Sequence, residues 1–357
     1  MPNVPSRLVS KCGRAVLCGV LILVFSSSPV FAAQKRPQTK KPAAKHAVAK
    51  KPAAPALDEQ ALQTQVMLDR AGFSPGEIDG RMGTSTKRAL EAFTKGGGTP
   101  DPATAPLVAY TITEADAAGP FTPDLPEDMM EKSKLAALGY KTLLEALGER
   151  FHVSPALLKT LNPQAKFASG EEIRVPNIEA TAIAAFPASP EAAPAPAAPA
   201  RGRQGDAGAP SARGRQGEAT PAVTVTVRKS TSDMTVTDAS GKTIFYAPVT
   251  TGSEHDPLPI GDWKVNGVQK NPTFQYNPDL FWDADPTHAK AKIPAGPNNP
   301  VGVVWVDISR PHYGLHGTPE PSTIGKTTSH GCVRLTNWDA QKLSGLVKPG
   351  TKVVFAE

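Results

Sequence analysis

The stretch Ser329-His330-Gly331-Cys332-Val333-Arg334-Leu335 carries the most information in this chain. A second histidine, His316, precedes the cysteine by 16 residues and is followed by Gly317. The thiolate is the reactive form of cysteine, and an imidazole within hydrogen-bond reach can take the proton of the thiol. The pattern therefore indicates nucleophilic catalysis, with Cys332 as nucleophile and His316 as general base and acid.

The first 32 residues are expected to be a secretory signal peptide rather than part of the fold. They combine a basic start, an apolar run at 15–25 and a small-residue cleavage site at Val30-Phe31-Ala32. The apolar run is short for a membrane span, although an uncleaved anchor would share the pattern. We therefore expect an exported protein of the periplasm or cell envelope, without an integral membrane span in its mature form.

Cysteine usage draws attention to the same motif. Cys12 and Cys18 lie in the expected signal, so Cys332 is expected to be the single thiol of the exported chain. A solitary thiol in an oxidising compartment cannot form an internal disulfide. An inert buried thiol and an intermolecular disulfide are the alternatives to a catalytic role.

The net charge of +6 is distributed unevenly. The expected signal carries three basic residues and residues 34–51 carry seven more, without acids in either segment, so the remainder has 29 basic and 33 acidic residues. The positive charge is therefore a tail, which could adhere to polyanionic envelope surfaces or act as a solvated spacer. Nothing in this pattern favours nucleic acid as a partner.

Two low-complexity segments divide the chain. Residues 33–57 are rich in Lys, Pro and Ala, and residues 180–222 are rich in Ala, Pro and Gly. Neither has the large apolar residues that a packed core requires. They are expected to be linkers that leave three domains, at 58–98, 105–178 and 223–356.

Residues 58–98 are expected to form a small all-α domain. Two amphipathic helices lie on either side of the glycine-punctuated loop 78–83, and Thr84 or Ser85 can cap the second helix. The Asp79-Gly80 turn and its flanking helices resemble the small peptidoglycan-binding domain of wall enzymes. A helical hairpin without a ligand is the alternative.

Residues 105–178 are expected to form a small α+β domain. The pattern predicts a strand at 110–113, helices at 143–151 and 155–161, and a closing strand at 173–176. This order resembles the LysM domain, which binds N-acetylglucosamine polymers. The usual Gly-Asp-Thr after the first strand is absent, and an insertion precedes the first helix. Glycan binding and a purely interdomain role therefore both remain open.

Residues 223–356 are expected to form a mostly-β domain with short helices. All four tryptophans lie in this segment, which suits the largest core of the chain. The turn Asp238-Ala239-Ser240-Gly241 predicts a hairpin. The expected elements are strands at 223–227, 234–237, 243–246, 301–308 and 352–355 and a helix at 337–346 that is capped by Asn337.

Neighbours of the nucleophile extend the candidate site. Gly331 lets the backbone turn sharply, so the amides of Gly331 and Cys332 and the side chain of His330 are candidate oxyanion donors. Arg334 is a multi-donor cation suited to a substrate carboxylate. His316, His330 and Cys332 could instead bind zinc, but a fourth ligand at the usual spacing is missing. Papain-like proteolysis is disfavoured, because Cys-Gly-x-Cys-Trp surroundings are absent.

The remaining histidines of the C-terminal domain are interpreted as structural. His255, His288 and His312 are expected to be surface or loop residues, and Tyr313 is expected to pack rather than to bind substrate.

The motifs together resemble the L,D-transpeptidase catalytic (YkuD) domain over residues 223–356. The resemblance implies a transferase with Cys332 as nucleophile and with His316 as base, oriented by the backbone carbonyl of Gly317. It also places Ser329, Arg334 and Asn337 at the substrate. The resembling stretches are 247–252, 257–261, 297–302, 316–318, 324–325 and 329–337.

The resemblance implies a peptidoglycan substrate, no cofactor and no metal. The thiolate attacks the carbonyl between an L-configured centre and the terminal D-alanine of a stem tetrapeptide. D-alanine leaves, and an acceptor amine on a stem peptide, a lipoprotein or an outer-membrane protein resolves the thioester. An L,D-carboxypeptidase, with water as acceptor, and a non-catalytic wall-binding anchor are the alternatives.

Overall fold

The computed structural model describes residues 57–101, 103–181 and 222–357, and these belong to one compact unit. The expected signal peptide lies outside the described residues, as do nearly all residues of the two expected linkers. Within the described part of the chain, no helix has the length and apolar character needed to cross a membrane.

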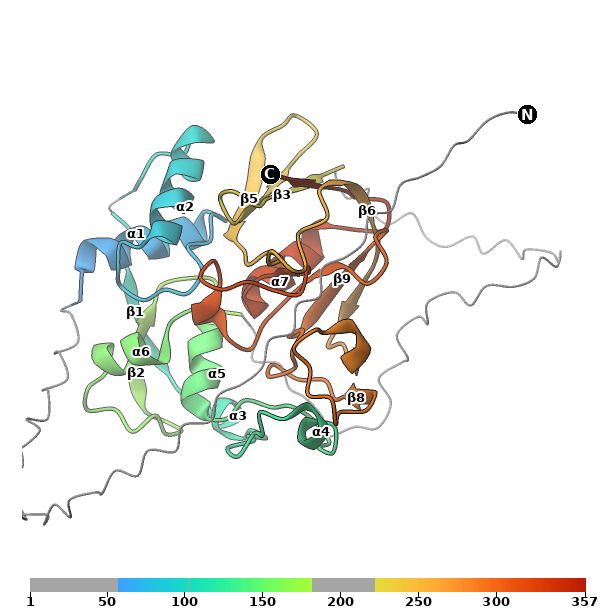
Figure 1. Ribbon diagram of the computed structural model, residues 1–357. Coiled ribbons are helices and arrows are strands. Elements are labelled where there is room, and N and C mark those ends of the chain that lie inside the picture. The colour runs from blue at the N-terminus through green and yellow to red at the C-terminus, as the bar shows by residue number, and fades with distance from the viewer. Residues whose placement is uncertain (1–56, 102, 182–221) are drawn as a thin grey trace, which may run out of the picture. The chain divides into compact units, whose positions relative to one another are not determined.

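An eight-stranded sheet dominates the C-terminal part (Figure 1). Its order is β11-β10-β9-β6-β12-β3-β4-β5, and all neighbours are antiparallel except the pairs β12–β3 and β10–β11. This architecture confirms the mostly-β expectation for this part of the chain. The strands are β3 (Thr224–Arg228), β4 (Asp233–Thr237), β5 (Thr243–Pro248), β6 (Gly261–Lys270), β9 (Val304–Ile308), β10 (Gly314–His316), β11 (Val333–Arg334) and β12 (Lys352–Ala356).

Alternating apolar residues explain how the sheet buries its inner face. Val225 and Val227 of β3 are buried while their neighbours are partly exposed, the period-two pattern of a half-buried strand. Helix α7 (Asn337–Leu346) packs against β9 and β10 and contributes Leu343, which is 0% exposed, to the same core.

Helix α7 has the expected bounds, but its N-cap is the residue before the expected one. Thr336 is the N-cap, and its hydroxyl accepts a hydrogen bond from the amide of Asp339 at 3.1 Å. The expected cap, Asn337, is wrong because its side chain turns inward, where its carbonyl oxygen accepts from the amide of Val303 at 3.1 Å.

The first segment folds as two helices, α1 (Glu59–Arg70) and α2 (Thr84–Lys95). The expected cap at Thr84 or Ser85 is wrong, because Gly83 occupies the N-cap position and no side chain caps the helix. The hydroxyl of Thr86 instead accepts a hydrogen bond of 3.1 Å from the side-chain amide of Gln65, and this bond joins the two helices.

The middle segment has the expected strand–helix–helix–strand order. Strand β1 (Leu107–Thr111) pairs antiparallel with β2 (Glu172–Pro176), and α5 (Leu143–Arg150) and α6 (Pro155–Leu161) lie between them in sequence. The insertion after β1 contains two short helices, α3 (Glu114–Ala117) and α4 (Met129–Lys132).

The first and middle segments share one hydrophobic cluster. Leu62, Val66 and Ile78 of the first segment pack with residues such as Leu147 and Ile173 of the middle segment. A second cluster joins α1 and α2 to Tyr246 of β5. The stability of the first segment is therefore coupled to that of the middle segment and of β5.

A small substructure stands between β6 and β9 in sequence. Strands β7 (Phe274–Tyr276) and β8 (Ala291–Ile293) form a two-stranded antiparallel sheet, and the short helix η1 (Pro278–Leu280) lies between them. We call residues 272–293 the lid. Figure 1 shows α4 beside β8, and the two elements are in contact.

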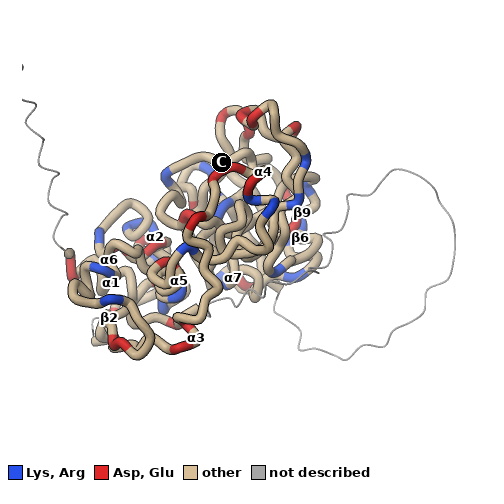
Figure 2. The backbone as a smooth tube through the Cα atoms, turned by 90° about the horizontal axis from the view of Figure 1, so that it is seen from below, with Lys and Arg blue, Asp and Glu red and all other residues tan. Residues whose placement is uncertain are grey.

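Acidic and basic residues are interspersed along the described chain (Figure 2). This distribution agrees with the near balance of charge expected once the basic N-terminal tail is set aside.

Candidate active site

The candidate nucleophile lines a cavity of about 690 Å³. Cys332 precedes β11, is partly exposed, and is the single cysteine among the described residues. Its Sγ lies 3.7 Å from the carbonyl oxygen of His312. Desolvation raises the pKa of the thiol to about 11, although the Gly314 backbone and Arg334 act in the opposite direction.

The backbone before the nucleophile is tightly constrained. Gly331 has a φ of +100°, and a Cβ there would lie 2.6 Å from Tyr313 Cε1, so this position requires glycine. The hydroxyl of Ser329 donates to the carbonyl of Cys332 at 2.6 Å, and the amide of Ser329 donates to Thr251 at 3.0 Å. Ser329 lines the cavity as expected of a substrate contact, but its hydroxyl is used to shape this loop.

The candidate base is held by its own backbone. His316 ends β10, is 4% exposed, and its Nδ1 lies 2.7 Å from the carbonyl oxygen of Gly317. A carbonyl only accepts hydrogen bonds, so Nδ1 carries the proton and Nε2 is left as the proton acceptor. Trp305 stacks on the imidazole with ring centroids 5.5 Å apart.

Burial sets the protonation state of this imidazole. It lowers the pKa of His316 to about 4, with Arg334 acting in the same direction and the Gly317 carbonyl against it. With the thiol pKa near 11, imidazole and thiol are both neutral at pH 7 in this conformation.

Strand pairing brings the two motifs together. Strands β10 and β11 are parallel neighbours in which Leu315 pairs with Val333 and His316 with Arg334. Residues two apart on an extended chain share a face. Cys332 and Arg334 therefore point to the same side, and both line the cavity together with His316.

Arg334 is the cation of this cavity wall. Desolvation lowers its pKa, but guanidinium stays protonated in proteins. Among the described residues, no carboxylate forms a salt bridge with this guanidinium, so its donors are available to an anionic group in the cavity.

His330 contacts the lid. Its Nε2 lies 2.8 Å from the Asp283 carboxylate, and Phe281 packs edge-on against its ring at 5.0 Å. Its oxyanion role, like that of the Gly331 amide, stays a prediction. No group of three or more potential metal ligands that could hold an ion is found among the described residues.

Asn337 is placed differently from its expected role. Its side chain is 0% exposed and does not line the cavity. Its Nδ2 donates to Glu149 Oε2 at 2.9 Å and to the carbonyl of Pro297 at 3.2 Å. A Cβ on Gly317 would lie 2.2 Å from Asn337 Oδ1, so this amide packs directly under the turn that orients His316.

Glu149 is a site residue that sequence reasoning missed. It comes from α5, and its other carboxylate oxygen accepts from the hydroxyl of Tyr140 at 2.9 Å. Burial of the carboxyl group raises its pKa to about 7. The sequence placed it on an amphipathic helix 188 residues from Asn337, and no local pattern marks such a pairing.

Two histidines interpreted as structural also belong to the cavity. His312 and His288 both line it, and His288 lies in a loop as expected, although its side chain is only 13% exposed. His255 is 61% exposed, as expected. Tyr313 lines the cavity and also packs against the main core.

A neutral thiol, a buried imidazole and a guanidinium thus line one cavity, an arrangement suited to nucleophilic catalysis by the thiol. Comparison with known proteins gives the family. Residues 222–355 match the model of the YkuD family, the L,D-transpeptidase catalytic domain. This part of the chain is therefore similar to that family.

Individual relatives match over shorter stretches. A YkuD protein of Bacillus licheniformis is 47% identical over 57 residues, which cover 16% of this chain and 34% of that protein. The probable L,D-transpeptidase YbiS of Escherichia coli K12 is 34% identical over 119 residues, or 32% and 38% of the two chains. The matches thus span little more than a third of these relatives. The structure of L,D-transpeptidase 3 from Mycobacterium tuberculosis in complex with a faropenem-derived adduct aligns with a TM-score of 0.32 and 21% identity, covering 38% of this chain and 61% of that one.

Proposed function

We propose that this protein is a peptidoglycan L,D-transpeptidase that uses Cys332 as its nucleophile. One observation carries the proposal: Cys332, Arg334 and a tautomer-fixed His316 line the same cavity in a chain segment of the L,D-transpeptidase family. The donor is a stem tetrapeptide of peptidoglycan.

The first half-reaction forms a thioester. His316 Nε2 takes the thiol proton as Sγ attacks the carbonyl between the L-configured centre and the terminal D-alanine. Proton transfer between a thiol of pKa about 11 and an imidazole of pKa about 4 is uphill, so it is expected to accompany the attack rather than to precede it. The imidazolium then protonates the leaving amine of D-alanine.

The second half-reaction releases the acyl group. An acceptor amine, deprotonated by the same imidazole, attacks the thioester and restores the thiol. The acceptor is a second stem peptide, which gives a 3-3 cross-link, or an amine of an envelope protein. Arg334 is expected to hold a substrate carboxylate, and amides near Gly331 are expected to receive the oxyanion.

The N-terminal segments are proposed to hold the enzyme on its polymer. The peptidoglycan-binding-like residues 58–98 and the LysM-like residues 105–178 would raise the local concentration of the catalytic domain on an insoluble wall. This role fits an exported protein of the cell envelope.

Incubation of the purified protein with a tetrapeptide muropeptide, followed by mass spectrometry, tests the proposal. We expect loss of D-alanine and formation of a cross-linked dimer, and we expect Cys332→Ala to abolish both. Tripeptide without dimer would indicate the carboxypeptidase alternative. Wild-type turnover that survives in Cys332→Ala would refute the mechanism, and an inert wild type would favour the wall anchor.

A further inference from the structure

The lid forms one wall of the cavity and reaches the catalytic loop. Phe274, Tyr276 and Phe281 line the cavity, with Tyr276 and Phe281 stacked at 5.9 Å. Asp283 of the lid hydrogen-bonds His330, two residues before Cys332. The position of the lid therefore determines how much of the nucleophile a bulky substrate can reach.

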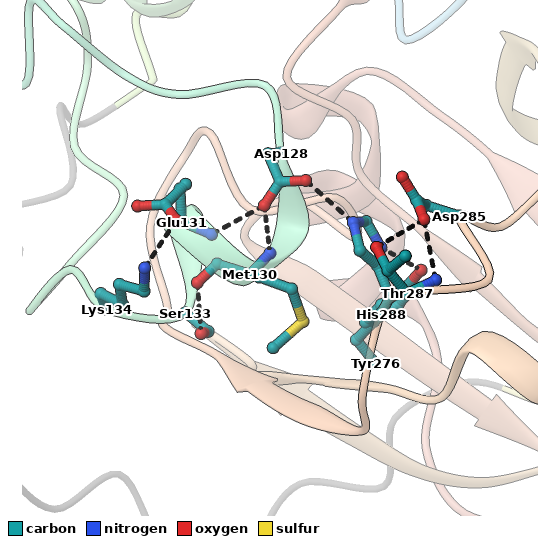
Figure 3. A network of polar contacts seen from close by, with 9 residues as sticks. All are labelled: Asp128, Met130, Glu131, Ser133, Lys134, Tyr276, Asp285, Thr287 and His288. Atoms are coloured by element: carbon teal, nitrogen blue, oxygen red, sulfur yellow. Dashed lines mark hydrogen bonds and ion pairs between the residues drawn. The ribbon is translucent and has the colours of Figure 1, made fainter.

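A segment from the distant insertion holds this lid. We call residues 125–138, which include α4, the strap. Figure 3 shows Asp128 of the strap pointing at His288 of the lid, with Oδ2 2.8 Å from Nε2. The other ring nitrogen of His288 lies 2.9 Å from the hydroxyl of Tyr276. Both nitrogens of one imidazole thus link the strap to a ring of the cavity wall.

The same aspartate also starts helix α4. Its Oδ1 accepts from the amides of Met130 at 2.8 Å and Glu131 at 2.9 Å, while its Oδ2 contacts His288. One carboxylate therefore fixes the direction of the helix and its contact with the lid (Figure 3).

Apolar packing and backbone pairing anchor the strap independently of this contact. Leu138 is 0% exposed and clusters with Tyr276 and Ile293 of the lid. Its amide donates to the carbonyl of Ala295 at 2.9 Å. A Cβ on Gly296 would lie 2.1 Å from the Leu138 carbonyl oxygen, so the backbone approach here is close. The strap should stay in place when the Asp128–His288 contact is removed.

The strap also supplies a wall of the cavity itself. Met129 lines the cavity that contains Cys332 and His316. The strand–helix–helix–strand core of the middle segment is complete without this insertion, so the fold of that segment does not explain the strap. Helix α4 of the strap contacts β8 of the C-terminal segment.

We propose that the strap completes the substrate site: Asp128, through His288, positions the lid over Cys332, and Met129 sets the width of the cavity. This inference rests on the proposed function for the identity of the substrate. The positioning of the lid is testable without it.

The first test measures access to the thiol in the full chain. Cys332 is labelled with iodoacetamide or with a bulky aryl maleimide, and the Cys332 peptide is quantified by mass spectrometry. The variant His288→Phe keeps a ring against Tyr276 but loses both hydrogen bonds. In this variant we expect the rate of labelling by the maleimide to rise about tenfold, while the rate with iodoacetamide changes less than about twofold. This difference is expected when the lid opens locally and the rest of the fold is kept.

A second variant and a control separate positioning from folding. Asp128→Ser keeps a capping oxygen but cannot reach His288, so it should match His288→Phe, and the double variant should add nothing further. Lys134→Ala removes only an exposed ion pair with Glu131 and should label like wild type. Wild-type labelling in both His288→Phe and Asp128→Ser would overturn the proposal.

Kinetics with the tetrapeptide muropeptide give the second readout. We expect KM to rise about tenfold in Asp128→Ser with kcat within about twofold, because binding rather than chemistry is weakened. Met129→Ala should raise turnover of a donor with a bulkier side chain relative to the tetrapeptide. Absence of wild-type turnover would refute the proposed function alone, whereas unchanged KM and unchanged labelling would refute the role of the strap.

Discussion

At the scale of single residues, burial explains the resting state of the candidate dyad. A thiol with its pKa raised to about 11 and an imidazole with its pKa lowered to about 4 do not form an ion pair at neutral pH. This differs from thiol enzymes in which a charged histidine stabilises the thiolate before the substrate binds. Cys332 is therefore expected to be protected from adventitious oxidation, which requires the thiolate.

This protonation state predicts a pH dependence. Alkylation of Cys332 by iodoacetamide should rise about tenfold per pH unit from pH 7 to pH 10, because the thiolate is a minor species throughout that range. The rate is measured by mass spectrometry of the Cys332 peptide, with a short cysteine peptide as the control, whose rate should level off above about pH 9. A plateau for Cys332 beginning near pH 5 would show a preformed ion pair instead.

At the scale of secondary structure elements, two contacts build the site. The parallel pairing of β10 with β11 brings His316 beside Arg334. The helix α5 places Glu149 against Asn337, which packs under the His316–Gly317 turn. The first contact joins neighbouring motifs, whereas the second reaches from a different segment of the chain.

Glu149 is predicted to position the catalytic turn. Glu149→Gln can still accept from Asn337 and contact Tyr140, so its kcat should stay within about threefold of wild type. Glu149→Leu leaves the buried donors of both partners unpaired, so we expect kcat to fall about tenfold or more and the free energy of unfolding to fall by about 1–3 kcal/mol. Steady-state kinetics and urea unfolding measure the two effects. Equal kcat in the two variants would contradict the positioning role.

Element prediction from sequence succeeded where the signal was local. The Asp238–Gly241 turn predicted the β4–β5 hairpin, and the helix predicted at 155–161 is observed with the same bounds as α6. Both helix caps that sequence reasoning assigned near Thr84 and Asn337 were wrong. At α2, Gly83 occupies the cap position, and at α7 the Asn337 side chain bonds to the Val303 amide instead. Local helix propensity predicts neither outcome.

At the scale of the whole molecule, α7 is a junction of the described segments. Ser74 of the first segment donates to Asp339 at 2.9 Å, and His152 of the middle segment stacks on Trp338 at 5.0 Å. His152 also contacts Asp69 at 2.8 Å. The helix that carries Asn337 is thus fixed from outside the catalytic domain.

Three carboxyl groups with raised pKa values predict how stability depends on pH. Burial raises the pKa values of Glu77, Glu149 and Asp339 to about 7. Their folded forms therefore hold protons that the unfolded chain releases, so stability falls as pH rises through 7. We expect the free energy of unfolding to drop by about 2 kcal/mol between pH 6.5 and pH 8.

Urea unfolding across this pH range checks the prediction. His316, whose pKa is lowered from 6.5 to about 4, acts in the opposite direction, but its contribution changes by only about 0.4 kcal/mol between pH 6.5 and pH 8. A Glu149→Gln/Asp339→Asn double variant should lose about two thirds of the dependence. Stability that is constant or that rises over the range would contradict the burial of these groups.

The sequence by itself predicted the candidate site residues and the mostly-β class of the C-terminal segment. Cys332, His316, Gly331 and Arg334 could be named because nucleophile, base and turn residue follow local rules of spacing and side-chain type. Period-two hydrophobic patterns were enough to predict the mostly-β class. These signals are encoded within a few residues of each other.

Only the tertiary structure decided which distant segments complete the site. Glu149, Asp128 and Met129 all come from the middle segment, and the first two bond to residues 188 and 160 positions away. A carboxylate on an amphipathic helix and a methionine in an insertion look the same in sequence whether they face water or an active site. Their roles depend on packing between segments, which a local pattern does not record.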